Sequence, residues 1–99
     1  MLNFEEIISI LSRYRERLQT EFGVRRIGVF GSYARGEQTQ ESDIDFIVDF
    51  ADDLMDIFET KYQLRRFLSE IFNKQIDLAN YKSIKPYVLE NISREIKFA

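Results

Sequence analysis

The amino-acid sequence reads GSYARG at residues 31–36 and SDIDF at residues 42–46, and these two runs decide how the rest of the chain is interpreted. Apolar residues alternate over Val24–Phe30, directly before the first run, and again over Asp43–Phe50. A period of two is typical of β-strands, and Tyr33–Gln40 between them predicts a short helical turn or loop. The centre of the chain is therefore expected to fold as strand, turn and strand.

A helix is predicted before this unit. Apolar residues recur at helical spacing from Phe4 to Phe22, behind a capping-box pattern formed by Asn3 and Glu6. Gly23 is a natural helix stop. One continuous helix is expected over these residues.

The second half of the chain predicts two more helices and a strand. Residues 51–53 supply a turn and an N-cap for a helix over Leu54–Ile71, and Gln75–Ala79 is predicted to be a short third strand. Pro86 suits the first turn of a last helix, whose apolar stripe extends to Ile96. We therefore predict an α/β (α+β) fold, in which helices pack on a small mixed sheet of three to four strands.

The composition limits the chemistry that is available. The length suits one domain, residues 1–99, and 44% of the residues are hydrophobic, which is enough for a core. The sequence has no Cys and no His, which excludes disulfides, the usual zinc sites and any catalysis that needs those side chains. The remaining ligands are oxygen atoms, and these favour Mg²⁺.

The charge and hydropathy of the sequence argue against nucleic acid and membrane as partners. The formal net charge is −3, whereas a free-standing nucleic-acid-binding domain usually carries a basic surface, so direct nucleic-acid binding is not expected. No apolar run approaches the length of a membrane-spanning helix, and no signal peptide is visible at the N-terminus. The default expectation is a cytoplasmic protein with no membrane partner.

Three aspartates are candidates for a metal site. Asp43 and Asp45 are two residues apart in a predicted strand, so their carboxylates lie on the same face. Two unpaired carboxylates repel each other, and a shared Mg²⁺ would reverse that penalty. Asp77, which stands alone among apolar neighbours in the third strand, is the candidate third carboxylate if two ions are used.

The turn after the first strand is a candidate phosphate site. Gly31 would let the backbone approach a ligand closely, and Ser32 offers a hydroxyl and an N–H at the start of a helical turn. Arg35 could add a phosphate ligand or form a surface ion pair, and both interpretations stay open. No Walker-type phosphate-binding loop occurs, because the sequence lacks its Gly and Lys spacing.

Each feature also has an ordinary alternative when taken alone. A strand with two alternating aspartates is often only a solvent-facing surface, and a Gly-Ser pair is a common turn. Asp77 could be an exposed strand residue, and Tyr33 is expected to pack rather than to stack on a base. The combination of the features, and not any one of them, favours a catalytic site.

That combination resembles the signature of the polymerase-beta-type nucleotidyltransferase superfamily. Gly31-Ser32, ten intervening residues and then Asp43-Ile44-Asp45 are similar to its motif, and the longer runs at 31–36 and 42–46 look like its minimal, MNT-domain branch. The resemblance also covers the leading helix, the strand at 75–78 and the last helix. Tyr33 departs from the pattern, because a basic residue is frequent there, but no catalytic group is affected.

The resemblance implies a nucleotidyltransferase fold and a division of roles among the site residues. Gly31 and Ser32 would hold the triphosphate of ATP, and Asp43 and Asp45 would hold Mg²⁺. Asp77 would be the third carboxylate, acting as a metal ligand or as the base for an acceptor hydroxyl.

The resemblance also implies a partner. MNT-domain proteins are often encoded beside HEPN-domain toxins. The expected reaction is AMP transfer from ATP to a hydroxyl of a HEPN toxin, with a Tyr hydroxyl as the expected acceptor, and this transfer silences the toxin. Two alternatives stay open: an antitoxin that neutralises its toxin by binding alone, and an enzyme that nucleotidylates a small molecule. The oligomeric state, homo-oligomer or hetero-oligomer with the partner, is also open.

Overall fold

A four-stranded mixed sheet forms the centre of the molecule. The computed structural model describes residues 1–99, and the strands are β1 (Val24–Phe30), β2 (Ile44–Phe50), β3 (Ile76–Asn80) and β4 (Lys97–Phe98). Their order in the sheet is β3-β2-β1-β4; β2 runs antiparallel to β1 and parallel to β3, and β4 runs antiparallel to β1. The predicted fold class, helices on a small mixed sheet, is confirmed.

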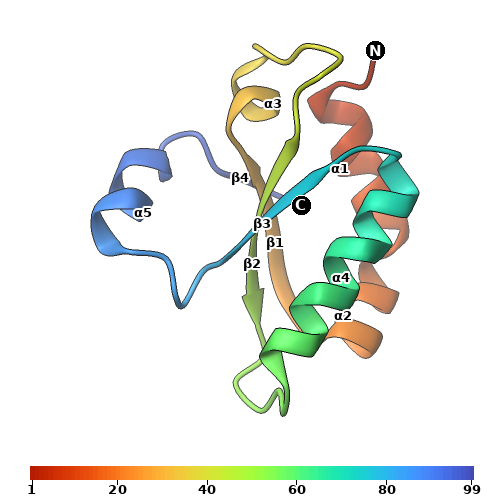
Figure 1. The fold of residues 1–99 in the computed structure, drawn as a ribbon, viewed down its shortest axis with the longest axis vertical. Helices are drawn as coiled ribbons and strands as arrows, with labels where there is room; N and C mark the ends of the chain where they lie inside the picture. The colour runs from red at the N-terminus through yellow and green to blue at the C-terminus, as the bar shows by residue number, and fades with distance from the viewer.

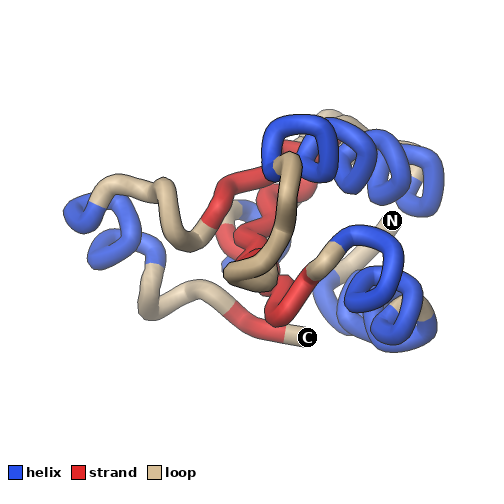
Figure 2. Tube along the Cα trace, turned by 90° about the horizontal axis from the view of Figure 1, so that it is seen from below, coloured by secondary structure: helices blue, strands red, loops and turns tan.

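Helices cover the two faces of this sheet unequally. The helices α1 (Phe4–Arg13), α2 (Arg15–Phe22) and α4 (Ile57–Phe72) lie together on one side, and α5 (Pro86–Ile92) lies on the other (Figures 1 and 2). The short α3 (Ser32–Arg35) follows β1 at one end of the sheet. No helix is long and apolar enough to cross a membrane.

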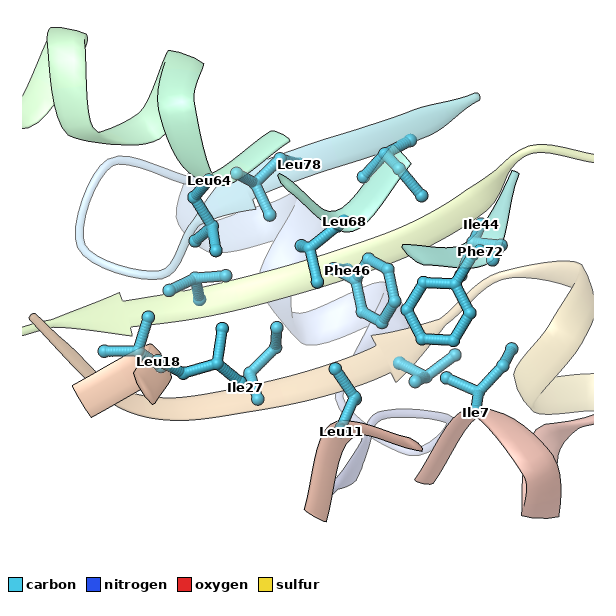
Figure 3. Close-up of a cluster of buried hydrophobic side chains, with 14 of the residues drawn as sticks. Ile7, Leu11, Leu18, Ile27, Ile44, Phe46, Leu64, Leu68, Phe72 and Leu78 are labelled. Atoms are coloured by element: carbon cyan, nitrogen blue, oxygen red, sulfur yellow. The ribbon is translucent and has the colours of Figure 1, made fainter. Parts of the chain in front are cut away.

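The hydrophobic core lies between the sheet and the larger helical layer (Figure 3). Alternate residues of β2 point into it, and Ile44, Phe46 and Val48 are fully buried. They meet Leu64 and Leu68 of α4, which are also fully buried. This alternation leaves the aspartates of β2 on the opposite face, as the sequence predicted.

The prediction of one continuous helix before β1 was wrong. Tyr14, with φ −101° and ψ 11°, leaves the helical region and separates α1 from α2. Its ring packs edge-on against Phe67 of α4, with the ring centroids 5.4 Å apart. The packing of the two elements on α4 thus overrides a periodicity that extends across the break.

The start of α4 was also predicted too early. Its N-cap is Asp56, whose side chain accepts a hydrogen bond of 3.1 Å from the N–H of Glu59, so residues 51–53 form only the preceding turn. Leu54 lies outside the helix and packs against the core. A cap three residues later satisfies the same N–H groups and leaves the hydrophobic face of α4 unchanged.

The last helix ends earlier than its apolar stripe suggested. It stops at Ile92, and the chain returns to pair as β4 with the free edge of β1. Ile96 and Phe98 lie over Gly28, where an added Cβ would meet each of them at 3.0 Å. Ile96 is therefore apolar because it packs on the sheet and not because it continues a helix.

Candidate active site

The predicted motif residues meet at the end of the sheet beside α3 (Figure 1). Gly31 directly follows β1, whose last residue, Phe30, is the register partner of Asp45 on β2. Asp45 is in turn the register partner of Asp77 on the parallel strand β3. Residues 31, 45 and 77, which are distant in sequence, are brought side by side because β1 ends here and the neighbouring strands β2 and β3 begin here.

Gly31 is required by its contact with Asp45. Its φ of 74° and ψ of −153° form a backbone conformation that is essentially restricted to glycine. A Cβ at this position would lie 2.1 Å from Oδ2 of Asp45 and 3.0 Å from its carboxyl carbon. Glycine therefore makes room for the carboxylate as well as for the turn.

The Asp45 carboxylate is held in an unfavourable electrostatic environment. Burial, followed by the negative charge of Asp77 and a hydrogen bond with its carboxyl group, and then the charge of Asp43, raise the pKa of Asp45 to about 6. Arg35 acts in the opposite direction, but as a smaller effect. The site thus concentrates negative charge that the protein itself does not neutralise.

This excess negative charge fits a divalent cation. Carboxylate oxygens are the ligands that Mg²⁺ prefers, and a cation would relieve the repulsion that raises the pKa of Asp45. Asp45 and Asp77 are neighbours in the sheet. Asp45 is half-buried, and both Asp43 and Asp77 are exposed. No group of three acidic side chains lies close enough together to hold an ion in this conformation. The assignment of all three aspartates as metal ligands stays a prediction.

The predicted phosphate site already carries a carboxylate of the protein. The N–H of Gly31 donates a hydrogen bond to Oε2 of Glu95, and Nη1 of Arg35 donates to the same oxygen at 2.9 Å. The Nε of Arg35 donates to Glu37 at 2.8 Å. The hydrogen bond to Glu37 is the largest cause of a raised pKa of Arg35, and the charge of Glu95 adds to it.

Sequence reasoning did not find Glu95. It lies 64 residues from Gly31 and between α5 and β4, in a segment that the sequence assigned to a helix. Nothing in its local pattern distinguishes it from the exposed Glu90. Only the return of the chain onto the edge of β1 brings it to the motif.

An open groove adjoins the other side of the carboxylates. Its volume is about 460 Å³, and Asp43 and Asp77 line it together with three side chains of α4, Arg65, Arg66 and Ser69. No role was predicted from the sequence for the two arginines, and both are exposed. Their position beside two predicted catalytic carboxylates was not expected. Tyr33, by contrast, is buried in the core, as predicted.

Comparison with known proteins connects this site to a family. Residues 11–99 match the family described as a nucleotidyltransferase domain. The chain belongs to this nucleotidyltransferase family. It is 39% identical over 100 residues to the protein adenylyltransferase MntA of Thermococcus cleftensis, and the match covers 99% of this chain and 97% of that protein. The expected enzyme class is confirmed: the chain is a nucleotidyltransferase.

Solved structures of nucleotidyltransferases share the fold. A minimal nucleotidyltransferase aligns with a TM-score of 0.80 and 25% identity, covering 97% of this chain and 95% of that one. A toxin–antitoxin with AMP-PNP aligns with a TM-score of 0.69 and 26% identity, covering 87% of this chain and 69% of that one. These similarities confirm the resemblance that the sequence motif indicated.

Proposed function

We propose that this nucleotidyltransferase moves AMP from ATP to a hydroxyl group of a partner protein, a tyrosine of a HEPN-domain toxin, and so acts as an antitoxin. The observation that carries the proposal is the pair of facing carboxylates, Asp45 and Asp77, beside Gly31. Two similarities support it: the near full-length relative is a protein adenylyltransferase, and a structural neighbour is a toxin–antitoxin with an ATP analogue.

The residues of the site divide the work of this reaction. The phosphate tail of ATP would lie along Gly31, Ser32 and Arg35, whose N–H, hydroxyl and guanidinium groups are hydrogen-bond donors. Asp43 and Asp45 would hold Mg²⁺, with Asp77 as a third ligand or as the base for the acceptor hydroxyl. The ion, when bound, would neutralise the negative charge of the carboxylates and phosphates. The bond from the acceptor oxygen to the α-phosphorus forms, the bond to the β-phosphate oxygen breaks, and pyrophosphate leaves.

The acceptor hydroxyl must lose its proton in this step. The chain has no His, so the proton would pass to a carboxylate or would be released because a bound metal ion lowers the pKa of the hydroxyl. Asp77 is the carboxylate that suits the role of base, because it is exposed on β3 and lines the groove, whereas Asp45 is partly buried between Gly31 and Asp77.

The position of the groove suggests where the acceptor approaches. An in-line displacement has the attacking and leaving oxygens on opposite sides of the phosphorus. If the leaving phosphates lie on the α3 side of Asp45, the acceptor comes from the β3 side, where Asp77, Arg65 and Arg66 line the groove. An acidic segment around the acceptor hydroxyl would complement the two arginines.

Intact-mass spectrometry tests the proposal directly. The chain is mixed with the HEPN-domain protein encoded beside it, Mg²⁺ and ATP, and the partner is weighed. Mass increases in steps of one AMP are expected with the wild type and with Asp53→Asn, a matched control because Asp53 is an exposed turn residue without an ion pair. They are expected to disappear in Asp43→Asn and Asp77→Asn.

The alternatives give different results in the same experiment. A partner that keeps its mass and is nevertheless inhibited would favour an antitoxin that acts by binding alone. An unmodified and uninhibited partner, with ATP consumed only when a small hydroxyl compound is added, would favour nucleotidylation of a small molecule.

A further inference from the structure

The carboxylate of Glu95 occupies donors that the proposed function assigns to phosphate. One oxygen, Oε2, accepts a hydrogen bond from the backbone N–H of Gly31 and another from the guanidinium of Arg35. A single oxygen that accepts from a backbone N–H and an arginine is the pattern expected of a bound phosphate oxygen. The side chain of Glu95 is 21% exposed, so it is held in the site and does not extend into solvent.

We infer that Glu95 is a competing anion that sets the nucleotide affinity of this enzyme, and that a nucleotide must displace it to bind. The inference rests on the proposed function, because it assumes that phosphate uses Gly31 and Arg35. The N–H of Gly31 has one hydrogen, which cannot serve Glu95 and a phosphate oxygen fully at once. Two anions at the same donors also repel each other.

The segment that carries Glu95 is held loosely enough to move. Helix α5 before it has no buried residue, and β4 after it pairs with β1 through only two residues, both of them exposed. Short elements with few buried contacts open at low free-energy cost. Glu95 can therefore leave the donors with little change to the core, because only Ala99 among residues 93–99 packs against it.

Glu37 shows why Glu95 and not another acid has this role. Glu37 also pairs with Arg35, but its side chain is 65% exposed and it has no bond to Gly31. A nucleotide can bind Arg35 while Glu37 remains at the outer side of the guanidinium. Only the Glu95 contact involves both proposed phosphate donors.

The fraction of molecules in which Glu95 occupies the donors sets how much its removal changes nucleotide affinity. The apparent dissociation constant of a ligand equals its intrinsic value divided by the fraction of protein that is competent to bind. If Glu95 occupies the donors in about nine molecules of ten, its removal should tighten nucleotide binding by about tenfold. Nucleotide binding should also release the segment Ser93–Ala99 from the sheet edge.

Calorimetric titration with MgATP tests the first consequence. Glu95→Gln is compared with wild type and with Glu90→Gln, a matched control because Glu90 is exposed on α5 and forms no ion pair. We expect the dissociation constant for MgATP to fall by about tenfold in Glu95→Gln and to stay unchanged in Glu90→Gln. An equal or weaker affinity in Glu95→Gln would overturn the inference, since it would make Glu95 a structural tie or a group that orients Arg35.

Hydrogen exchange of the wild-type chain tests the second consequence without any variant. MgATP should accelerate amide exchange in Ser93–Ala99, where the N–H of Ala99 bonds to the carbonyl of Ile27, and should not accelerate it in β2. Slower exchange in that segment would also overturn the inference. A failure of the proposed function is distinguishable: AMP transfer would then be absent although MgATP binds more tightly to Glu95→Gln. If neither protein binds MgATP, both the inference and the proposed function are wrong.

Discussion

Asp45 and Asp49 lie four residues apart on β2 and point to the same face of the sheet, yet they have opposite electrostatic surroundings. Asp49 has two cationic partners: Nε of Arg26 lies 3.6 Å from its Oδ2, and Nζ of Lys82 lies 3.8 Å from its Oδ1. Asp45 faces other carboxylates, and its pKa is raised to about 6 by burial and by the charges of Asp77 and Asp43.

At the end of β2 that carries Asp49, which we call the paired end, cationic side chains balance the acidic ones. The guanidinium of Arg26 lies between the rings of Tyr81 and Phe98, at 4.8 and 4.5 Å from their centroids, which fixes it beside Asp49. Lys82 also binds Asp52, and its hydrogen bond and charge lower the pKa of Asp52. Such an arrangement balances the charge of the acidic residues within the protein and needs no ligand.

The unpaired end has no such explanation within the folded chain. Burying like charges together lowers stability, and strongly perturbed carboxylates cluster at functional sites. The number of aspartates does not identify the site, since both ends of β2 are acidic. The absence of ion-pair partners for the carboxylate is what distinguishes the end that carries Asp45.

Activity should separate the two ends most strongly. Asp45→Asn and Asp49→Asn are equal chemical changes on one strand, but only Asp45 belongs to the proposed site. We expect Asp45→Asn to lower the rate of AMP transfer on the order of 10²–10³-fold, because it removes a charge that stabilises the reacting groups, and Asp49→Asn to leave the rate unchanged. Initial rates of partner modification, measured at a temperature where both variants are folded, decide the matter. Equal losses of rate in both variants would show that the two ends of β2 do not differ in function.

A pair of glycines provides a second contrast. Gly31 and Gly36 both have positive φ, 74° and 72°, so a side chain strains the backbone at either position by about 1–3 kcal/mol. An added Cβ at Gly31 meets Asp45 at 2.1 Å, whereas at Gly36 it meets nothing within 4 Å.

Gly31→Ala should therefore abolish measurable MgATP binding, because Asp45 has to move, and Gly36→Ala should keep it. Titration calorimetry on both variants is the measurement, with the melting temperature recorded to compare the shared backbone strain. Wild-type affinity in Gly31→Ala would mean that the turn has only a structural role and that Asp45 needs no space there.

The sequence predicted the unpaired end well for a physical reason. The alternation of residues in β2 and β3 fixes which side chains share a face, so Asp45 and Asp77 could be placed opposite the core before the register was known. Gly31 was predicted from the turn alone, although its conflict with the Asp45 carboxylate depends on tertiary structure. Local pattern and motif spacing were sufficient to predict which side chains meet at this end of the sheet.

The features that sequence reasoning missed depend on long-range packing. The break at Tyr14 follows from its contact with Phe67, and β4 forms because the edge of β1 is free to accept it. Glu95 reaches Gly31, and Arg65 reaches the groove beside Asp77, only after the sheet and α4 have assembled. No periodicity within a single segment contains that information.

The smallest predicted contrast is one of stability, and its sign depends on pH. The carboxyl group of Asp45 holds its proton more tightly in the folded chain, with a pKa of about 6, than in the unfolded chain, where aspartate titrates near about 4. Between these values the folded state binds more protons, so stability falls as the pH rises from about 4 to about 6 and stays reduced above that range. Asp45→Asn removes this loss.

In the absence of Mg²⁺, Asp45→Asn should therefore be more stable than wild type at pH 8, by on the order of 1 kcal/mol because Asp45 is partly solvent-screened, and equal to it at pH 4. Asp49→Asn should be less stable than wild type at pH 8, since Arg26 and Lys82 lose their shared carboxylate. Urea unfolding with a chelator present gives the free energy of unfolding of each of the three proteins at both pH values. Destabilisation by Asp45→Asn at pH 8 would show that its carboxylate is favourably paired after all, and would remove the distinction between the two ends of β2 on which the site assignment depends.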